Sequence, residues 1–136
     1  MTYFLDNTFP RKLTDILKLL EIDAVHLQTM FEPNTPDEIW IPQVSEENFI
    51  LLTGDGRIRK GSVERAALEQ SKLRAFFMFG GYTNLQLFKQ VAFIIDNWDE
   101  IDKEAQRLRS GEVRYINNNG KVMSYEQLAA KRQKKR

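Results

Sequence analysis

Three aspartates stand next to short apolar segments where their carboxylates could meet. Asp6 ends the first such segment, Asp55 lies two residues past the apolar run 49–53, and Asp37 begins the helix predicted after the run 24–27. In an open parallel sheet, ligands bind at the carboxyl ends of the strands, and all three positions belong to that edge. Converging carboxylates repel each other unless a cation lies between them. Mg²⁺ or Mn²⁺ takes oxygen ligands, activates water and stabilises charge on a phosphoryl group.

Each acidic residue also has a purely structural interpretation. Asp6 could cap the helix that follows it, and Asp55 within Gly-Asp-Gly could be a turn residue. Glu38 stands three residues after Thr35, which favours a capping box over a ligand role. Asp37 has no capping role in that arrangement and is therefore the preferred ligand. The metal site is favoured by the joint placement of the three aspartates.

A basic turn follows Asp55. Arg57, Arg59 and Lys60 place three positive charges within four residues, which could hold phosphates near a metal or form a solvated turn. Glu64 could pair with one of these arginines or add to the acidic cluster.

Other catalytic classes are excluded by residue counts. The chain has no cysteine, which excludes thiol nucleophiles, zinc–thiolate sites, iron–sulfur clusters and disulfides. Its single histidine, His26, lies in an apolar run and is expected to be a core residue. Any catalysis must therefore be carried by carboxylates and a metal.

The elements that position these residues alternate between strand and helix. Short apolar runs indicate strands at 3–6, 24–27, 49–53 and 74–79, and helical spacing or capping signals follow each run, near Pro10, Thr35, Ser62 and Asn84. This order predicts an α/β fold, a three-layer sandwich with a mainly parallel central sheet of about four strands.

The last part of the chain has a different pattern. We expect one domain over residues 1–110, then a C-terminal extension over 111–136. Asn119-Gly120 predicts a two-residue hairpin turn, and Ser124 with Gln127 predicts a capping box at the start of a cationic helix.

Charge is distributed unevenly along the chain. The net charge is +1, but five of the last six residues, 131–136, are basic, so residues 1–130 carry 15 basic and 19 acidic groups, a net of −4. The basic tail could be an arm that steers RNA or a solvated helix end that aids solubility. No apolar run is long enough for a membrane span and the N-terminus lacks a basic signal region, so we expect no membrane association and a cytoplasmic location.

Over roughly residues 1–100 the chain resembles the PIN-like domains of bacterial toxin–antitoxin systems, the VapC-like endoribonucleases. Three motifs in the right order carry this resemblance: Phe4-Leu5-Asp6-Asn7, Thr35-Pro36-Asp37-Glu38-Ile39-Trp40-Ile41, and Leu51-Leu52-Thr53-Gly54-Asp55-Gly56-Arg57-Ile58-Arg59 followed by Glu64-Arg65-Ala66-Ala67-Leu68.

The resemblance implies cleavage of single-stranded RNA with Mg²⁺ or Mn²⁺ held by Asp6, Asp37 and Asp55. It implies phosphate contacts from Arg57, Arg59 and Lys60, and support from Asn7, Glu38, Thr53 and Glu64. The family usually has a fourth acid, but no acid follows the strand at 74–79 here. A cognate antitoxin protein is the expected partner, and homodimers are frequent in the family.

Two other functions fit part of the pattern. The missing fourth acid is compatible with a catalytically inactive PIN-like module that binds RNA or a protein. A receiver-type phospho-acceptor domain also places acids at strand ends, but receivers usually pair acids after the first strand, whereas Asn7 follows Asp6 here.

Overall fold

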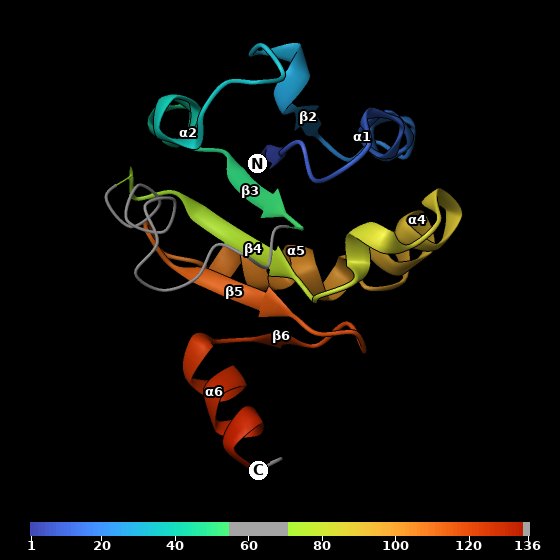
Figure 1. The fold of residues 1–136 in the computed structure, drawn as a ribbon, viewed down its shortest axis with the longest axis vertical. Helices are drawn as coiled ribbons and strands as arrows, with labels where there is room; N and C mark the ends of the chain where they lie inside the picture. Colours follow the sequence, from blue (N-terminus) through green and yellow to red (C-terminus); the bar gives the residue numbers. More distant parts are fainter. Residues whose placement is uncertain (55–70, 135–136) are drawn as a thin grey trace.

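The protein is built around one six-stranded sheet. The computed structural model describes residues 1–54 and 71–134. The sheet order is β2-β1-β3-β4-β5-β6, in which the first five strands are parallel and β6 is antiparallel (Figure 1). The strands are β1 (Tyr3–Leu5), β2 (Ala24–His26), β3 (Ile50–Thr53), β4 (Arg74–Met78), β5 (Val113–Ile116) and β6 (Val122–Met123).

The predicted α/β class is confirmed, but the predicted count of about four strands is wrong. Residues 111–136 were expected to form an extension, yet β5 continues the parallel sheet beside β4. Tyr115 of β5 stacks on Phe77 of β4 with ring centroids 5.2 Å apart. These contacts join residues far apart in sequence, so the local pattern gave no signal for them. The domain division at residue 110 stays a prediction.

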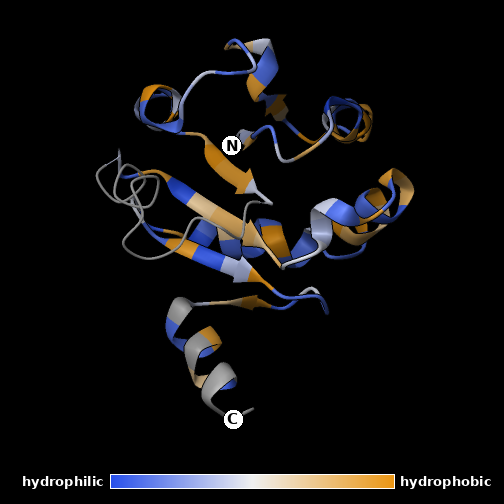
Figure 2. Ribbon diagram, in the orientation of Figure 1, coloured by the Kyte–Doolittle hydropathy of each residue, from blue (hydrophilic) through white to orange (hydrophobic). Residues whose placement is uncertain are grey.

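Alternating side chains of the strands build two cores, one on each face of the sheet. Tyr3, Leu5 and Leu52 point into one core, whereas Phe4 and Leu51 point into the other. Figure 2 shows β3 hydrophobic along its length, as a strand covered on both faces requires.

Helices cover both faces, which confirms the three-layer arrangement. The first core is covered by α1 (Arg11–Leu19), α4 (Leu87–Asp96) and α5 (Trp98–Arg107), and the second by α2 (Asp37–Glu46). Short 3-10 turns follow β2 and β4, namely η1 (Leu27–Thr29) and η2 (Tyr82–Asn84). The helix predicted from Ser62 lies outside the described residues.

Two predicted helices form, but each differs at one end from its prediction. The capping box at the start of α2 does not form, because the Thr35 hydroxyl donates to the Glu32 carbonyl at 2.7 Å and Pro36 occupies the cap position. The helix predicted from Asn84 onward forms as α4 from Leu87, but it ends at Asp96, so Trp98 begins the next helix instead. The side-chain amide of Asn97, between the two helices, donates to the Phe93 carbonyl at 2.8 Å.

The hairpin between β5 and β6 forms, with a longer loop than predicted. Asn117 N–H donates to the Lys121 carbonyl and Gly120 N–H to the Asn117 carbonyl, both at 2.9 Å, which leaves three loop residues. Gly120 has φ +81°, and a Cβ there would lie 1.9 Å from Oδ1 of Asn97. Both the backbone conformation and the close approach of Asn97 therefore require glycine.

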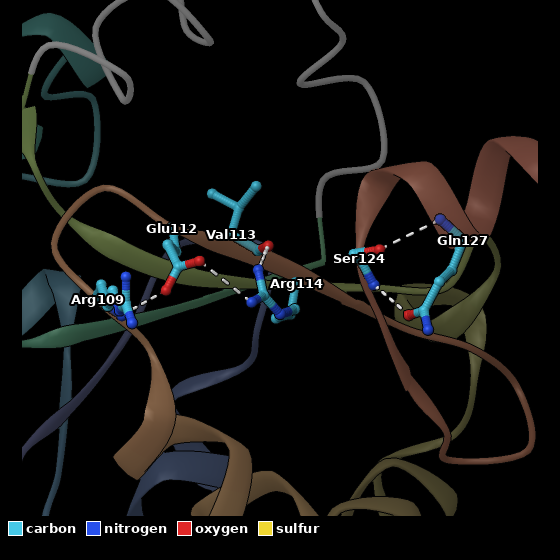
Figure 3. Close-up of polar contacts among 6 residues, drawn as sticks. All are labelled: Arg109, Glu112, Val113, Arg114, Ser124 and Gln127. Atoms are coloured by element: carbon cyan, nitrogen blue, oxygen red, sulfur yellow. Dashed lines mark hydrogen bonds and ion pairs between the residues drawn. The ribbon is translucent and has the colours of Figure 1, made fainter.

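The predicted capping box before the last helix, α6 (Tyr125–Lys134), is confirmed (Figure 3). Gln127 N–H donates to Oγ of Ser124 at 3.2 Å, and Ser124 N–H donates to Oε1 of Gln127 at 2.9 Å. Because β6 runs antiparallel to β5, α6 begins near the amino end of β5, away from the arrowheads of the parallel strands (Figure 1). Among the described residues, no helix is long and apolar enough to cross a membrane.

Candidate functional site

The point where the chain reverses its direction across the sheet lies between β1 and β3. From β1 the chain moves outward to β2, then returns to the other side of β1 to form β3, and continues through β4 and β5. Connections that leave in opposite directions open a crevice at the carboxyl ends of two neighbouring strands. Asp6 follows β1 and Gly54 follows β3, so both lie at this crevice.

Asp6 is a buried carboxylate surrounded by hydrogen-bond donors. Its side chain is 6% exposed. Oδ1 accepts a hydrogen bond from Thr8 N–H at 3.0 Å and a short one from the Thr8 hydroxyl, and the Thr53 hydroxyl also hydrogen-bonds the carboxylate. The hydrogen bonds of Asp6 therefore hold the turn after β1 and the end of β3 rather than cap α1.

Burial raises the pKa of Asp6 to about 6 from its ordinary value of 3.8. The hydrogen bonds from Thr53 and Thr8 oppose this rise in pKa, and the negative charge of Asp37 adds to it. Asp6 thus carries an energetically unfavourable charge at neutral pH, in the field of a second carboxylate. A bound cation would relieve both effects.

Asp37 stands at the first position of α2, where the helix dipole favours a negative charge. Its Oδ1 accepts a hydrogen bond from Nε1 of Trp40 at 2.9 Å, which orients the carboxylate. Its charge adds to the rise in the pKa of Asp6, so two of the three predicted ligands interact electrostatically. Glu38 is exposed in the same turn, without the capping partner expected for it.

Two predicted supporting residues, Thr53 and Asn7, make different contacts. Thr53 is fully buried at the end of β3 and hydrogen-bonds Asp6. The amide of Asn7 binds protein groups at both of its ends: Nδ2 donates to the Pro33 carbonyl at 2.6 Å, and Oδ1 accepts from the Gln28 amide at 3.1 Å. These contacts fasten the loop before α2 to the end of β1.

The segment that follows β4 is the short turn η2. β4 ends at Met78 and no acid lies in residues 79–84, as the sequence indicates. A Cβ placed on Gly54 would lie 2.5 Å from Cγ2 of Thr83 and 3.3 Å from Oγ1 of Thr8. The segment after β4 therefore contributes a threonine to the crevice.

The rest of the predicted site lies outside the described residues. This applies to Asp55 and Glu64 and to the predicted phosphate-binding residues Arg57, Arg59 and Lys60. Within residues 1–54 and 71–134, no group of three or more acidic or histidine side chains could hold a metal ion. The described part of the site is thus the Asp6–Asp37 pair, with Asp55 following Gly54 in the chain.

His26 is a core histidine, as expected. Its ring is buried in β2, with Nε2 2.8 Å from the Phe9 carbonyl and Nδ1 accepting a hydrogen bond from Gln28 N–H at 3.1 Å. Both ring nitrogens are engaged, which is typical of a structural role.

Sequence reasoning missed Thr8, whose hydroxyl bridges the ends of β1 and β3. Besides its bond to Asp6, the Thr8 oxygen accepts a hydrogen bond from Gly54 N–H at 2.7 Å. The spacing Asp-x-Thr is a signal for an aspartate that hydrogen-bonds its own backbone two residues on. That signal predicts the turn, but not the contact with Gly54, which is 46 residues away.

The arrangement fits a hard divalent cation. It offers carboxylate oxygens and nearby hydroxyl groups, which are ligands and supporting groups of the kind that Mg²⁺ and Mn²⁺ favour. The burial that raises the pKa of Asp6 also keeps its carboxylate away from bulk water, which strengthens its attraction to a cation.

Comparison with known families gives one match. A family model described as PIN like domain covers residues 1–80 of the 136. The matched region runs from the N-terminus past the end of β4 and includes Asp6, Asp37 and Asp55. No curated protein and no solved structure matches the chain significantly.

Proposed function

Because the chain belongs to the family of PIN-like domains, we propose that it is a Mg²⁺- or Mn²⁺-dependent endoribonuclease that cleaves single-stranded RNA. The observation that carries this proposal is the buried carboxylate of Asp6 at the switch point between β1 and β3, whose pKa is raised by burial and further by the charge of Asp37. PIN-like domains are commonly nucleases that use divalent metals.

In this proposal Asp6 and Asp55 hold the metal, and Asp37 holds it or orients the attacking water. The metal, when bound, activates water and stabilises negative charge on the phosphoryl group. Thr8 and Thr53 keep the Asp6 carboxylate in place through hydrogen bonds. Arg57, Arg59 and Lys60 contact the phosphates, and their fixed positive charges attract the RNA backbone.

We further propose that the protein is the toxin of a toxin–antitoxin pair in the cytoplasm. An antitoxin segment that crosses the crevice would offer a basic or polar group to Asp6 and Asp37. Homodimer formation belongs to the same proposal. Growth arrest on expression of the parent protein, absent for Asp6→Asn, is the expected result.

The direct test is cleavage of an unstructured, fluorescently labelled oligoribonucleotide with Mn²⁺, Mg²⁺ or EDTA. We expect metal-dependent cleavage by the parent and its loss in Asp6→Asn and Asp55→Asn. Asp23→Asn is a matched control, because Asp23 is an exposed aspartate just before β2, at the opposite edge of the sheet. Undiminished cleavage by Asp6→Asn and Asp55→Asn would show that the site is assigned wrongly.

A second candidate function is a catalytically inactive module, which is favoured by the absence of an acid in residues 79–84 after β4. A calorimetric titration with Mn²⁺ separates the two functions. Heat of binding that disappears in Asp6→Asn supports the nuclease. No binding at millimolar Mn²⁺ supports a module that binds RNA or protein without catalysis.

A further inference from the structure

Asn7 and Thr8, the two residues that follow Asp6, form hydrogen bonds to the segments that precede the other two proposed ligands. Asp6, Asp37 and Asp55 come from three separate parts of the chain, and each follows or begins a regular element. Without a metal, the charges of Asp6 and Asp37 repel each other, so the segments that carry them need other contacts to hold their positions. Metal sites depend on such supporting hydrogen bonds for their geometry.

Thr8 connects the end of β1 to the end of β3. A hydroxyl has one proton to donate and two lone pairs that accept. The Thr8 proton goes to Asp6 Oδ1, because a carboxylate only accepts, and the Thr8 oxygen accepts from Gly54 N–H at 2.7 Å. This bond fixes the position of Gly54, the residue that precedes Asp55 in the sequence.

Asn7 connects the end of β1 to the loop before α2. Its Nδ2 donates to the Pro33 carbonyl at 2.6 Å, four residues before Asp37. The loop between them is compact, because Thr35 N–H and the Thr35 hydroxyl both donate to the Glu32 carbonyl, at 3.0 and 2.7 Å. The hydrogen bond from Asn7 to Pro33 therefore also restricts the position of the first turn of α2.

We propose that Asn7 and Thr8 are positioning residues for the proposed metal ligands at this edge of the sheet. Thr8 holds the Asp6 carboxylate against the end of β3 at Gly54, and Asn7 holds the loop that leads to Asp37. This inference rests on the proposed metal site and assigns to Asn7 a role other than direct support of the metal. The two residues act through the carboxylates.

The test is the affinity for Mn²⁺ alone, measured by calorimetry and by the electron paramagnetic resonance of free Mn²⁺. Loss of a supporting contact around a metal ligand typically weakens metal binding by about 10- to 100-fold. We expect a loss in that range for Thr8→Val and recovery of most of the affinity in Thr8→Ser, which keeps the hydroxyl. Thr14→Val is the matched control, because the buried Thr14 hydroxyl has no hydrogen-bond partner.

A double-mutant cycle tests Asn7. We expect Asn7→Ala to weaken Mn²⁺ binding in the parent but to have no further effect in the Asp37→Asn background, because Asn7 acts through that carboxylate. Asn118→Ala, in the exposed tip of the hairpin, is the control. The same loss in both backgrounds would overturn the assignment of Asn7.

Parent affinity in Thr8→Val, or equal losses in Thr8→Val and Thr8→Ser, would overturn the assignment of Thr8. Hydrogen exchange of the Gly54 amide in the metal-free parent is a second measurement that needs no variant. We expect the Gly54 amide to be protected from exchange. Exchange at the rate of an unprotected amide would also overturn the assignment of Thr8. Parent affinity in Asp6→Asn would instead refute the metal site itself, and with it the proposed function.

Discussion

Asp6 makes the metal-free protein sensitive to pH at the scale of a single residue. Its pKa is raised from 3.8 to about 6 in the folded state, so the native protein binds the proton more tightly than the unfolded chain does. Its contribution to the free energy of unfolding is therefore largest below about pH 4 and is lost as the pH rises to about 6.

Replacement of Asp6 by asparagine removes this dependence. The change in pKa corresponds to about 3 kcal/mol as an upper limit, since Asn also disturbs the hydrogen bonds from Thr8 and Thr53. We expect the stability of Asp6→Asn relative to the parent to increase from about pH 4 to about pH 7, measured by urea unfolding in EDTA. A difference that stays constant across this range would contradict the raised pKa.

Gly54 is required by close packing. A Cβ there would lie 2.5 Å from Cγ2 of Thr83, so we expect Gly54→Ala to destabilise the fold by about 1–3 kcal/mol. The cost should shrink in the Thr83→Ser background, which lacks that methyl group. Gly80→Ala is the matched control, because nothing lies within 4 Å of a Cβ at Gly80. Equal costs with and without the Thr83 methyl would show that the contact is not responsible.

At the scale of elements, α6 depends on its capping box. Ser124→Ala removes the acceptor for Gln127 N–H, and loss of such a cap typically costs about 0.5–2 kcal/mol. We expect faster hydrogen exchange in the first turn of α6, with little change in β1 and β3. Ser110→Ala, at an exposed serine before β5, is the control. Uniformly faster exchange throughout the sheet would mean that α6 and the sheet unfold as one unit.

Arg114, in β5, is engaged by groups at the start of its own strand. Its guanidinium donates to Oε2 of Glu112 at 3.3 Å and to the Val113 carbonyl at 2.8 Å (Figure 3). The backbone N–H of Arg109 and the Arg114 guanidinium hold the pKa of Glu112 below its usual range. Arg114 is therefore already engaged within the turn.

At the scale of the whole molecule, α6, which contains residues 131–134 of the basic tail, begins at the opposite edge of the sheet from Asp6. We therefore expect deletion of residues 131–136 to leave Mn²⁺ affinity unchanged. Under the RNA-arm interpretation, the affinity for long single-stranded RNA decreases. The slope of log affinity against log salt decreases by at most about 3.5, from five charges at about 0.7 each.

A variant with the five basic residues of the tail changed to glutamine keeps the length and tests charge alone. Both variants should behave alike in fluorescence anisotropy with labelled RNA. Unchanged RNA affinity would assign the tail to solubility or to contact with an antitoxin.

Local patterns in the sequence determined the α/β class, the first four strands and the edge of the sheet where the site lies. Alternation of strands and helices is a property of short segments, so Tyr3–Leu5 and Ile50–Thr53 could be placed without knowledge of the fold. The capping box of Ser124 and Gln127 was also predictable, because its partners lie three residues apart. The same kind of signal failed at Thr35, where the Glu32 carbonyl competed for the hydroxyl.

Only the tertiary structure decided which distant segments meet. It placed β5 beside β4, Thr8 against Gly54, Thr83 at the same crevice and Asn7 on the loop that leads to Asp37. The raised pKa of Asp6 is likewise a tertiary effect, since it results from burial by the packed sheet and its helices. The sequence indicates which groups can do chemistry, whereas their separation, solvation and mutual repulsion depend on contacts that the folded chain alone creates.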